Sequence, residues 1–388
     1  MINERHLDDR VRRRLGSLTV YSGPTHSGKT KKLEADVERA RRQNRHVQRL
    51  DAATDPNDLF NQLEPATELV AIDDAQHYDD RLVPVLNDLA TVNRVDVVVA
   101  GWELDYGARP AGPMPELLCA ADLAFKLDDG VCAQPGCRNL ASRTQWFHAV
   151  NGSPQRFLPV CRRHHTPEPR TQSFQEVWFD EPAGSLDLIS GCMFSGKTQE
   201  LIRRMDQARF AGLSTQAFKP ALDDRYAIEA VASHRQVRFP AIAVPDAAAL
   251  SSQLRDDTRV IGIDEAQFFD AELVPLVEEL AGRGRHVIVA GLDLDFLARP
   301  FGPMPLLVAY ADRLTKLQAS CQFPGCGSRQ ATRTQRLVDG SPAPADAPLV
   351  LVGGAATYQA RCRHHHRVGI SGKQEAERVP VGEESAEL

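Results

Sequence analysis

Continuous apolar runs recur along the chain and alternate with segments of helical spacing. The apolar runs are SLTVYSG (17–23), DVVVAG (96–101), SLDLISG (185–191) and HVIVAGL (286–292). Strands of a parallel sheet give this pattern because both of their faces are buried. Two segments, KKLEADVERARR (31–42) and QELIRRMDQARFAG (199–212), space their apolar residues as helices do, and the second should stop near Gly212. The pattern predicts an α/β fold with parallel sheets.

Most of the distinctive text of the chain occurs twice, in the same order. The paired segments are GPTHSGKT (23–30) with GCMFSGKT (191–198), LVAIDDAQ (69–76) with VIGIDEAQ (260–267), VVVAGWELDYGARPAGPMPELL (97–118) with VIVAGLDLDFLARPFGPMPLLV (287–308), CAQPGCRNLASRTQ (132–145) with CQFPGCGSRQATRTQ (321–335), and CRRHH (161–165) with CRHHH (362–366). A repeat of this length exceeds a solenoid unit and indicates two copies of a whole domain. The first copy lacks counterparts of residues 219–236 and of the segment around 351–358.

We expect the first domain over residues 15–165 and the second over residues 185–370. The stretch 166–184 between them is rich in proline and has no periodicity, so it is interpreted as a linker. The last residues, 371–388, are polar and charged, and we expect them to be disordered.

Composition narrows the function classes. The 388 residues carry a net charge of −6, which offers no general attraction for nucleic acid or for an anionic membrane. The basic run RVRRRL (10–15) is interpreted as a solvated helix, with a nucleic-acid-binding arm as the alternative. No apolar run reaches the roughly 18 residues of a membrane span, and the N-terminal residues lack a hydrophobic signal region. We therefore expect a cytoplasmic protein without nucleic-acid or membrane partners.

A phosphate-binding motif stands at a strand-to-helix junction in each copy. Residues 191–198 fit G-x-x-x-x-G-K-[ST] between a predicted strand and a predicted helix, the context that this motif requires. Glycines let backbone N–H groups face phosphate oxygens at the helix N-terminus, the lysine reaches the β- and γ-phosphates, and the threonine binds Mg²⁺. The candidate ATP-binding residues are Gly191, Ser195, Gly196, Lys197 and Thr198, with Gly23, Gly28, Lys29 and Thr30 in the first copy.

Each motif is followed by an apolar strand that ends in two adjacent carboxylates. Asp264, and Asp73 in the first copy, are the acids expected to hold Mg²⁺ together with the P-loop threonine. The alternative for each is an acid that merely follows a strand end. Two matches in the same strand context favour the nucleotide-binding interpretation.

The eight cysteines indicate metal binding or free thiols rather than disulfides in the expected compartment. Two groups have ligand types that suit a closed, structural Zn²⁺ site: Cys321, Cys326, Cys362 and His365, and Cys132, Cys137, Cys161 and His164. Because CRRHH places Arg163 opposite His364, we select His365 and His164 as the histidine ligands. The alternative is a set of reduced core side chains. Cys119 is expected in the core, and Cys192, inside the P-loop, is a candidate for oxidation.

The second half resembles the cellular-type (type II) thymidine kinases. The matching text, over about residues 185–368, is GCMFSGKT, KPALDDRY, SH (233–234), IDEAQFF, GLDLDF, PFGPMP, RTQR (333–336), VGGAATY and CRHH. The first half, about residues 17–165, resembles the same family with altered or missing nucleoside-facing blocks. The resemblance implies two tandem RecA-like P-loop domains, each with a small zinc-binding lobe. Only the second copy keeps the loop of that lobe, the lasso, which closes over the nucleoside.

The resemblance implies a reaction that transfers the γ-phosphate of ATP to the 5′-hydroxyl of thymidine, a step of nucleotide salvage for DNA synthesis. A carboxylate must take the proton of that hydroxyl, and Glu265 matches the base of the family. The implied thymidine-binding residues are Met193, Phe268, Leu292, Phe296, Phe301, Thr334, Val352, Gly353, Gly354 and Tyr358. Asp223 and Arg225 match positions near the ribose and phosphates. Taken singly, the apolar members of this set would more often be core residues.

The first copy departs from this pattern on the acceptor side. Asp74 replaces the base, and the pocket positions carry Thr25, His77, Trp102, Tyr106 and Ala111. The lasso glycines and tyrosine and the DDRY segment have no counterpart. The shorter acid withdraws the carboxylate by about 1.5 Å, and a misplacement of about 1 Å can cost about 100-fold in rate. We therefore predict that this half binds nucleotide without phosphorylating thymidine.

Two alternatives remain open from the sequence. One is a deoxynucleoside kinase of broader base preference, and the other is a non-catalytic nucleotide-binding regulatory protein, which is favoured for the N-terminal half. Because the family assembles as tetramers, we expect a dimer of this two-domain chain. The sequence leaves open whether thymidine triphosphate (dTTP) exerts feedback on the enzyme.

Overall fold

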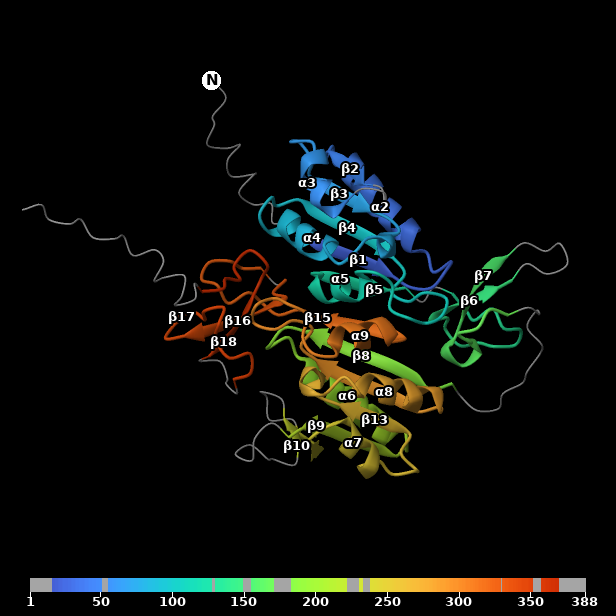
Figure 1. Ribbon diagram of the computed structural model, residues 1–388. Coiled ribbons are helices and arrows are strands. Elements are labelled where there is room, and N and C mark those ends of the chain that lie inside the picture. Colours follow the sequence, from blue (N-terminus) through green and yellow to red (C-terminus); the bar gives the residue numbers. More distant parts are fainter. Residues whose placement is uncertain are drawn as a thin grey trace, which may run out of the picture.

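The computed structural model describes residues 16–50, 55–127, 130–148, 155–170, 183–221, 230–232, 238–328, 330–351 and 357–369 (Figure 1). The basic run at 10–15, the tail at 371–388 and residues 171–182 of the expected linker lie outside the described residues. So do five of the expected site residues, namely Asp223, Arg225, Val352, Gly353 and Gly354. Within the described ranges, no helix combines the length and apolar character needed to cross a membrane.

The N-terminal half is built on a five-stranded parallel sheet with the strand order β2-β3-β4-β1-β5. Its strands are β1 (Leu18–Ser22), β2 (Val47–Leu50), β3 (Leu69–Ile72), β4 (Asp96–Gly101) and β5 (Leu123–Lys126). Its helices and 3-10 turns are α2 (Lys29–Arg42), η1 (Pro56–Asp58), α3 (Leu59–Gln62), η2 (Ala75–His77), α4 (Leu82–Thr91) and α5 (Met114–Ala120). Strand β3 is buried at every position, which explains its uninterrupted apolar text.

The C-terminal half is built on a six-stranded parallel sheet with the order β12-β9-β13-β14-β8-β15. Its strands are β8 (Ser185–Gly191), β9 (Thr215–Pro220), β12 (Ile242–Val244), β13 (Val260–Ile263), β14 (His286–Gly291) and β15 (Arg313–Leu317). In addition, β10 (Ala230–Ala232) and β11 (Arg238–Pro240) pair antiparallel in a separate two-stranded sheet. Its helices and 3-10 turn are α6 (Lys197–Phe210), α7 (Ala247–Gln253), η5 (Ala266–Phe268), α8 (Leu273–Gly282) and α9 (Met304–Tyr310).

The two sheets share one strand order. Replacing β1 to β5 by β8, β9, β13, β14 and β15 converts the first order into the second, apart from the added edge strand β12. Both expected helices are confirmed as α2 and α6, and the second ends before Gly212, whose φ is +77°. The prediction of an α/β fold with parallel sheets is confirmed.

A small antiparallel lobe is attached to each half, and the two lobes lie on opposite sides of the molecule (Figure 1). The first lobe contains β6 (Arg143–Phe147), β7 (Arg156–Val160) and the turn η3 (Arg162–His164), and the second contains β16 (Arg333–Val338), β17 (Ser341–Pro342) and β18 (Tyr358–Arg361). Part of the expected linker belongs to the first lobe. The N–H of Arg170 donates to the carbonyl of Trp146 at 2.9 Å, so the chain at Arg170 lies beside β6.

The two halves meet through equivalent elements, with α5 packed on α9 and β5 beside β15 (Figure 1). One buried apolar cluster contains residues of both halves. Two buried lysines cross this boundary. Lys126 Nζ pairs with Glu103 at 3.2 Å and donates to the Ala309 carbonyl at 2.6 Å, at the end of α9. Lys316 Nζ pairs with Asp293 at 2.9 Å and donates to the Cys119 carbonyl at 2.6 Å, at the end of α5.

Candidate functional site

The P-loop of the C-terminal half joins the end of β8 to the start of α6. Gly191 has a φ of +142°, and a Cβ atom there would lie 2.3 Å from the Leu317 carbonyl oxygen, so only glycine fits. Gly196, at the helix N-cap, has a φ of +93°. Lys197 Nζ donates to the Cys192 carbonyl within the loop at 2.8 Å. The Ser195 hydroxyl is buried and has no hydrogen-bond partner among the described residues. A loop of this shape, at a helix N-terminus, suits an anionic phosphate.

Asp264 lies beside the first turn of α6, directly after β13. The Thr198 hydroxyl donates to Asp264 Oδ2 at 2.9 Å. Burial, followed by the charge of Glu265, raises the pKa of Asp264 to about 7. A divalent cation would favour the ionised carboxylate, and a hydroxyl with a carboxylate is a donor set that Mg²⁺ accepts. These two residues therefore fit the role of Mg²⁺ ligands.

Glu265 is held in a fixed conformation next to this acid. Its φ is +52°, and its backbone N–H donates to Asp264 Oδ1 at 3.0 Å. The Gln267 amide donates to Glu265 Oε2 at 2.6 Å, while Gln267 Oε1 accepts from the backbone N–H of Leu292 at 2.9 Å. Gln267 thus ties the carboxylate to the end of β14. The role of Gln267 was not predicted from the sequence, although the glutamine of IDDAQ and IDEAQ is repeated.

The expected thymidine-binding residues that are described gather beyond the carboxyl ends of β8, β13 and β14 and on the second lobe. The Met193 N–H donates to the Thr334 hydroxyl at 3.1 Å, which joins the P-loop to β16. The rings of Phe268 and Phe301 meet edge to face at a centroid distance of 5.4 Å. Leu292, Phe296, Phe301, Thr334 and Tyr358 are buried.

The second lobe also supplies a charge next to these apolar walls. The Arg336 guanidinium lies 5.2 Å from the ring centroid of Phe296, and Arg336 pairs with Tyr358 across β16 and β18. The Tyr358 hydroxyl donates to the Leu351 carbonyl at 2.7 Å. Arg336 was not among the expected site residues, although it belongs to the RTQR text (333–336) that carries the resemblance.

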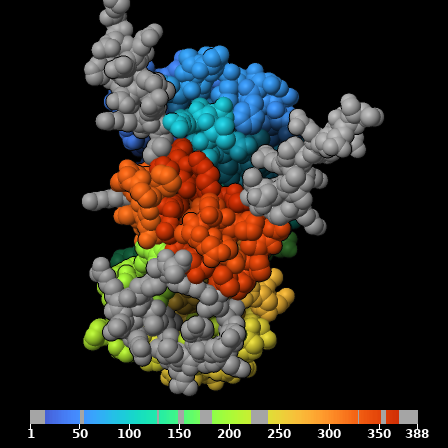
Figure 2. Space-filling view, turned by 90° about the vertical axis from the view of Figure 1, so that its left-hand side faces the viewer, coloured from blue at the N-terminus to red at the C-terminus, as the bar shows by residue number. Residues whose placement is uncertain are grey.

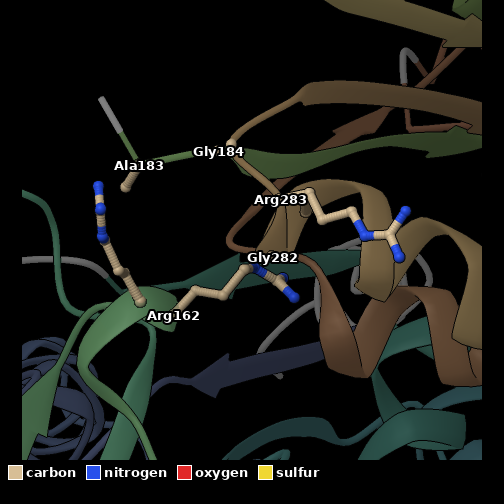
Figure 3. Close-up of a pocket in the computed structure, with 8 residues that line it drawn as sticks. Arg162, Ala183, Gly184, Gly282 and Arg283 are labelled. Carbon is tan, nitrogen blue, oxygen red and sulfur yellow. The ribbon is translucent and has the colours of Figure 1, made fainter. Parts of the chain in front are cut away.

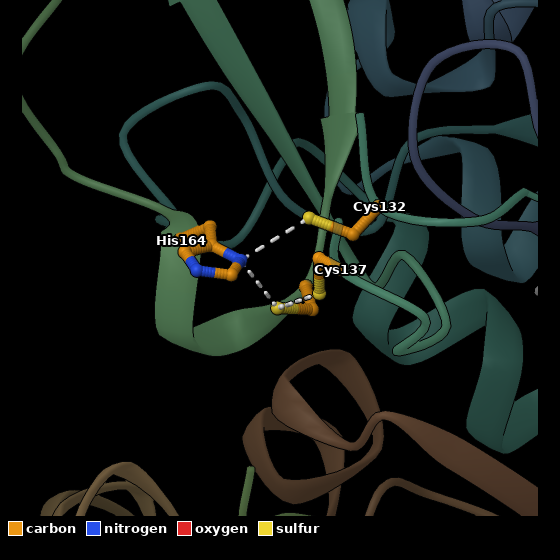
Figure 4. A group of neighbouring side chains, drawn as sticks. Cys132, Cys137 and His164 are labelled. Carbon is orange, nitrogen blue, oxygen red and sulfur yellow. Dashed lines mark hydrogen bonds between the residues drawn. The ribbon is translucent and has the colours of Figure 1, made fainter. Parts of the chain in front are cut away.

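Both Cys₃His groups come together as the sequence predicts. In each group the candidate ligand atoms lie within 4.8 Å of one another. Cys326 Sγ and Cys362 Sγ are 3.9 Å apart, and Cys137 Sγ and Cys161 Sγ are 4.0 Å apart. A tetrahedral ion with Zn–S bonds of about 2.3 Å requires sulfur separations of about 3.8 Å. In the first group His164 Nδ1 lies 3.4 Å from Cys132 Sγ (Figure 4).

The choice among adjacent histidines is confirmed by their partners. His365 Nδ1 is 3.2 Å from Cys362 Sγ and belongs to the metal group. The two neighbouring histidines point away from the metal group. His364 Nε2 lies 2.9 Å from the Gly16 carbonyl, and His366 Nε2 lies 2.9 Å from the Phe296 carbonyl. The donor sets fit structural Zn²⁺, which would fix the base of each lobe.

The N-terminal half repeats the phosphate-site geometry. Lys29 Nζ donates to the Pro24 carbonyl at 3.1 Å, and the Thr25 N–H donates to the Thr144 hydroxyl at 2.9 Å. Asp74 has a φ of +54° and accepts from the Gln76 amide at 3.1 Å. Burial lowers the pKa of Lys29, against the charges of Glu103, Asp73 and Asp74.

The two acids of the N-terminal site are less buried than the equivalent acids of the C-terminal site. Asp264 is buried and Glu265 half-buried, whereas Asp73 is half-buried and Asp74 exposed. The described residues include no bond between Thr30 and Asp73 equivalent to the one between Thr198 and Asp264. In the C-terminal half β12 adds a further strand beyond β9, and the described part of the N-terminal sheet ends at β2.

Aromatic rings occupy the acceptor side of the N-terminal half. Tyr106 and Trp146 lie 4.8 Å apart by ring centroids, and Phe157 lies 6.2 Å from Trp146 and 6.3 Å from Trp102. Lys29 Nζ lies 5.6 Å from the Trp102 ring centroid. The pairing of β6 with β7 places Phe157 where β18 carries Tyr358. The expectation that this tyrosine has no counterpart is therefore wrong, because an aromatic ring is kept near the start of β7.

The two remaining cysteines are both buried. Cys119 is in the core as expected. Cys192 is also buried, its thiol contacts the Ala331 carbonyl at 3.2 Å, and burial raises its pKa to about 11. A buried thiol that stays protonated is a poor target for oxidation, so the expectation for Cys192 is not supported.

Two pockets lie away from the P-loops. One, of about 150 Å³, lies between the first lobe and the start of β8, and Arg162, Gly184 and Arg283 help to line it (Figure 3). Its arginines are already paired, Arg162 with Asp312 at 3.0 Å and Arg283 with Glu279. The other, of about 640 Å³, includes Thr215 at the start of β9. It therefore lies at the amino ends of the strands, whereas Asp264 follows the carboxyl end of β13. Neither pocket adds a group to the phosphate sites.

Comparison with known proteins agrees with this geometry. A family model described as thymidine kinase matches residues 50–165 and 184–366. A protein named thymidine kinase from Coprothermobacter proteolyticus is 54% identical over 185 residues, which cover 48% of this chain and 91% of that relative. The matched length is close to that of one half of the chain. The chain belongs to the thymidine kinase family.

Proposed function

We propose that the C-terminal half transfers the γ-phosphate of ATP to the 5′-hydroxyl of thymidine. Family membership supports the reaction. The observation that carries the assignment to this half is the fixed pair of Asp264 and Glu265 beside the P-loop, with Glu265 oriented by Gln267. An acceptor hydroxyl in line with the γ-phosphate needs a base at this position.

Each residue has a separate role in this proposal. Lys197 and the backbone N–H groups of the P-loop bind the phosphates, with Gly191, Ser195 and Gly196 giving the loop its shape. Thr198 and Asp264 would hold Mg²⁺, which would neutralise charge on the phosphate oxygens. Glu265 accepts the proton of the 5′-hydroxyl as the new P–O bond forms and the bond from the γ-phosphorus to the bridging oxygen breaks, which releases ADP.

The acceptor would lie between η5, the loop after β14 and the second lobe. Met193, Phe268, Leu292, Phe296, Phe301, Thr334 and Tyr358 are proposed to contact it, together with Val352, Gly353 and Gly354 of the lasso. Asp223 and Arg225 are proposed near the ribose and phosphates. Five of these residues lie outside the described ranges, so their roles rest on the sequence.

For the N-terminal half we propose phosphate binding without thymidine phosphorylation. The retained contacts of Lys29 and Thr25 support a phosphate site. The ring cluster of Trp102, Tyr106, Trp146 and Phe157 supports the loss of the acceptor, because these side chains take the positions that face the nucleoside in the other half. A structural or regulatory role follows for this half.

The test is an assay of the purified full chain with ATP, Mg²⁺ and thymidine. Formation of thymidine monophosphate, followed by chromatography, is expected. Its absence would reject the proposal and favour a nucleotide-binding regulatory protein. Competition by other deoxynucleosides at equal concentration would distinguish a thymidine-specific enzyme from a broader deoxynucleoside kinase. The same preparation would show whether dTTP inhibits and, by light scattering, whether the chain forms the proposed homodimer.

A further inference from the structure

The second lobe contacts both halves of the molecule. Figure 2 shows this lobe, in orange and red, beneath the blue and cyan N-terminal half and above the green and yellow C-terminal half. Towards its own half, Thr334 accepts from the P-loop N–H of Met193. Towards the other half, the lobe inserts Arg363 between α4 and α5, where its guanidinium donates to Asn87 at 2.6 Å and to the Ala120 carbonyl at 2.8 Å.

Asp122 is the centre of this second contact. It lies in the N-terminal half, between α5 and β5, and is 5% exposed. Its oxygens accept from Arg363 Nε at 2.7 Å, from the Thr332 hydroxyl at 2.8 Å and from the Leu18 N–H at 2.9 Å. Burial raises the pKa of Asp122, but the charges of Arg363 and Arg333 outweigh it and lower the pKa to about 2. The carboxylate is therefore charged at neutral pH.

The two partners of Asp122 on the second lobe are close in sequence to groups of the proposed thymidine site. Thr332 stands two residues before Thr334, which binds the P-loop. Arg363 follows the zinc ligand Cys362, which itself follows β18 and its first residue, Tyr358. If the carboxylate were lost, Arg363 and Arg333 would be buried beside it without their counter-charge, which is costly unless the lobe moves.

From these contacts we propose that Asp122 of the N-terminal half is a positioning residue for the thymidine site of the C-terminal half. It acts through Thr332 and Arg363, by fixing β16 and β18 against the P-loop. This inference rests on the proposed function of the C-terminal half. It gives the N-terminal half a role in catalysis that needs neither bound nucleotide nor chemistry of its own.

The chain contains a matched control for this residue. Asp312 occupies the equivalent place in the C-terminal half and receives the first lobe. It accepts from Arg162 Nε at 3.0 Å, from the Leu186 N–H at 2.8 Å and from the Ser142 hydroxyl. A change at Asp312 removes the same kinds of bond from the same boundary, but from the lobe that carries no thymidine site.

The experiment compares two pairs of variants in the full chain, Asp122→Asn with Asp312→Asn and Thr332→Val with Ser142→Ala. Asp122→Asn and Thr332→Val should raise the KM for thymidine about tenfold, as expected for loss of a group that orients a binding residue. The KM for ATP should change little. Asp312→Asn and Ser142→Ala should lower the Tm to a similar extent and leave the KM for thymidine unchanged. The effects of Asp122→Asn and Thr332→Val should not add, because the two residues share one contact.

Hydrogen exchange provides a reading that does not depend on activity. Backbone amides of residues 333–338 and 357–361 should exchange faster in Asp122→Asn than in Asp312→Asn. Equal effects of the two pairs on KM and on exchange would reduce Asp122 to a structural residue and overturn the proposal. Should Asp122→Asn fail to fold, Thr332→Val against Ser142→Ala decides alone. A wild-type chain that is inactive on thymidine would reject the proposed function, while the exchange comparison would still decide the placement of the lobe.

Discussion

The two P-loops of this chain differ little, whereas the acceptor sites beside them differ in almost every residue. In both loops the lysine donates to a loop carbonyl and a threonine of the lobe receives a loop N–H. On the acceptor side, the C-terminal half has Phe296 and Arg336 where the N-terminal half has Tyr106 and Trp146.

This difference shows that the two kinds of site depend on different parts of the chain. A phosphate site is made mainly by backbone N–H groups and glycine conformations, which a single strand-to-helix junction supplies. An acceptor site needs side chains from η5, the β14 loop and a lobe more than 30 residues further on. In the N-terminal lobe the same strand register that pairs Arg336 with Tyr358 pairs Trp146 with Phe157, so rings stand at both positions.

The largest difference between the halves should appear at the P-loop lysines. Lys197→Ala should lower thymidine phosphorylation by about 100- to 1,000-fold, because one preorganised charge at the transferred phosphate is lost. Lys29→Ala should leave the rate within about twofold, since it removes a group remote from the reaction. Steady-state assays of both folded variants test this. If Lys29→Ala abolished activity and Lys197→Ala spared it, the assignment of the halves would be reversed.

The second-largest difference between the halves should come from the carboxylate that follows the proposed Mg²⁺ ligand, which is Glu265 in one half and Asp74 in the other. Glu265→Asp should lower kcat about 100-fold, because the shorter side chain withdraws the base by more than 1 Å from the hydroxyl. Asp74→Glu should produce no second active site, since Trp102 and Tyr106 still fill the acceptor position. Single-turnover rates of the two variants provide the measurement. A gain of activity in Asp74→Glu, seen in a Lys197→Ala background, would contradict this account.

Loss of a metal ligand should affect the two lobes unequally. Cys326→Ser and Cys137→Ser should each lower the zinc content by about one ion per chain, because four ligands are needed for a closed site. Only Cys326→Ser should lower kcat/KM for thymidine, by about tenfold, since only its lobe carries Thr334 and Tyr358. Atomic absorption and kinetics on the same samples test both statements. Equal kinetic losses would mean that the zinc sites act on overall stability alone.

The smallest effect is the pH dependence of the stability that Asp122 contributes at the boundary between the halves. The pKa of Asp122 is lowered from 3.8 to about 2, so the stability that it contributes is present above pH 4 and is lost as the pH falls towards 2. A shift of this size corresponds to about 2 kcal/mol. The Tm difference between wild type and Asp122→Asn should therefore shrink between pH 5 and pH 3. A difference that stays constant over this range would show that folding does not lower the pKa of Asp122.

Much of the fold and of the chemistry could be predicted from local sequence. The apolar strands, the helices after the P-loops and the Cys₃His groups depend on short spacings, and the structure confirms them. His365 could be chosen because two copies of one motif constrain each other. The described ATP-binding and thymidine-binding positions remain predictions of role, although their side chains do gather around the P-loop and β14.

The features that could not be predicted are those that depend on long-range packing. Neither the part played by Gln267 nor the position of Phe157 follows from spacing, because each depends on which backbone atoms lie opposite in the folded sheet. The role of Asp122 requires knowing that the second lobe reaches across to the other half. Cys192 was misjudged for a similar reason, because its burial comes from Ala331 in the lobe.

The crossed lysines at the boundary, Lys126 and Lys316, have a consequence for how such a chain can change over generations. Each ammonium group satisfies carbonyls at the end of a helix in the opposite half, so neither half is complete at this surface without the other. Under the proposed function, the acceptor positions of the N-terminal half can change without loss of thymidine phosphorylation. The boundary between the two halves is constrained by contrast, because deleting the N-terminal half would expose charges that are now buried. If the N-terminal half has no substrate of its own, as proposed, its part in this shared surface is a reason for the chain to retain it.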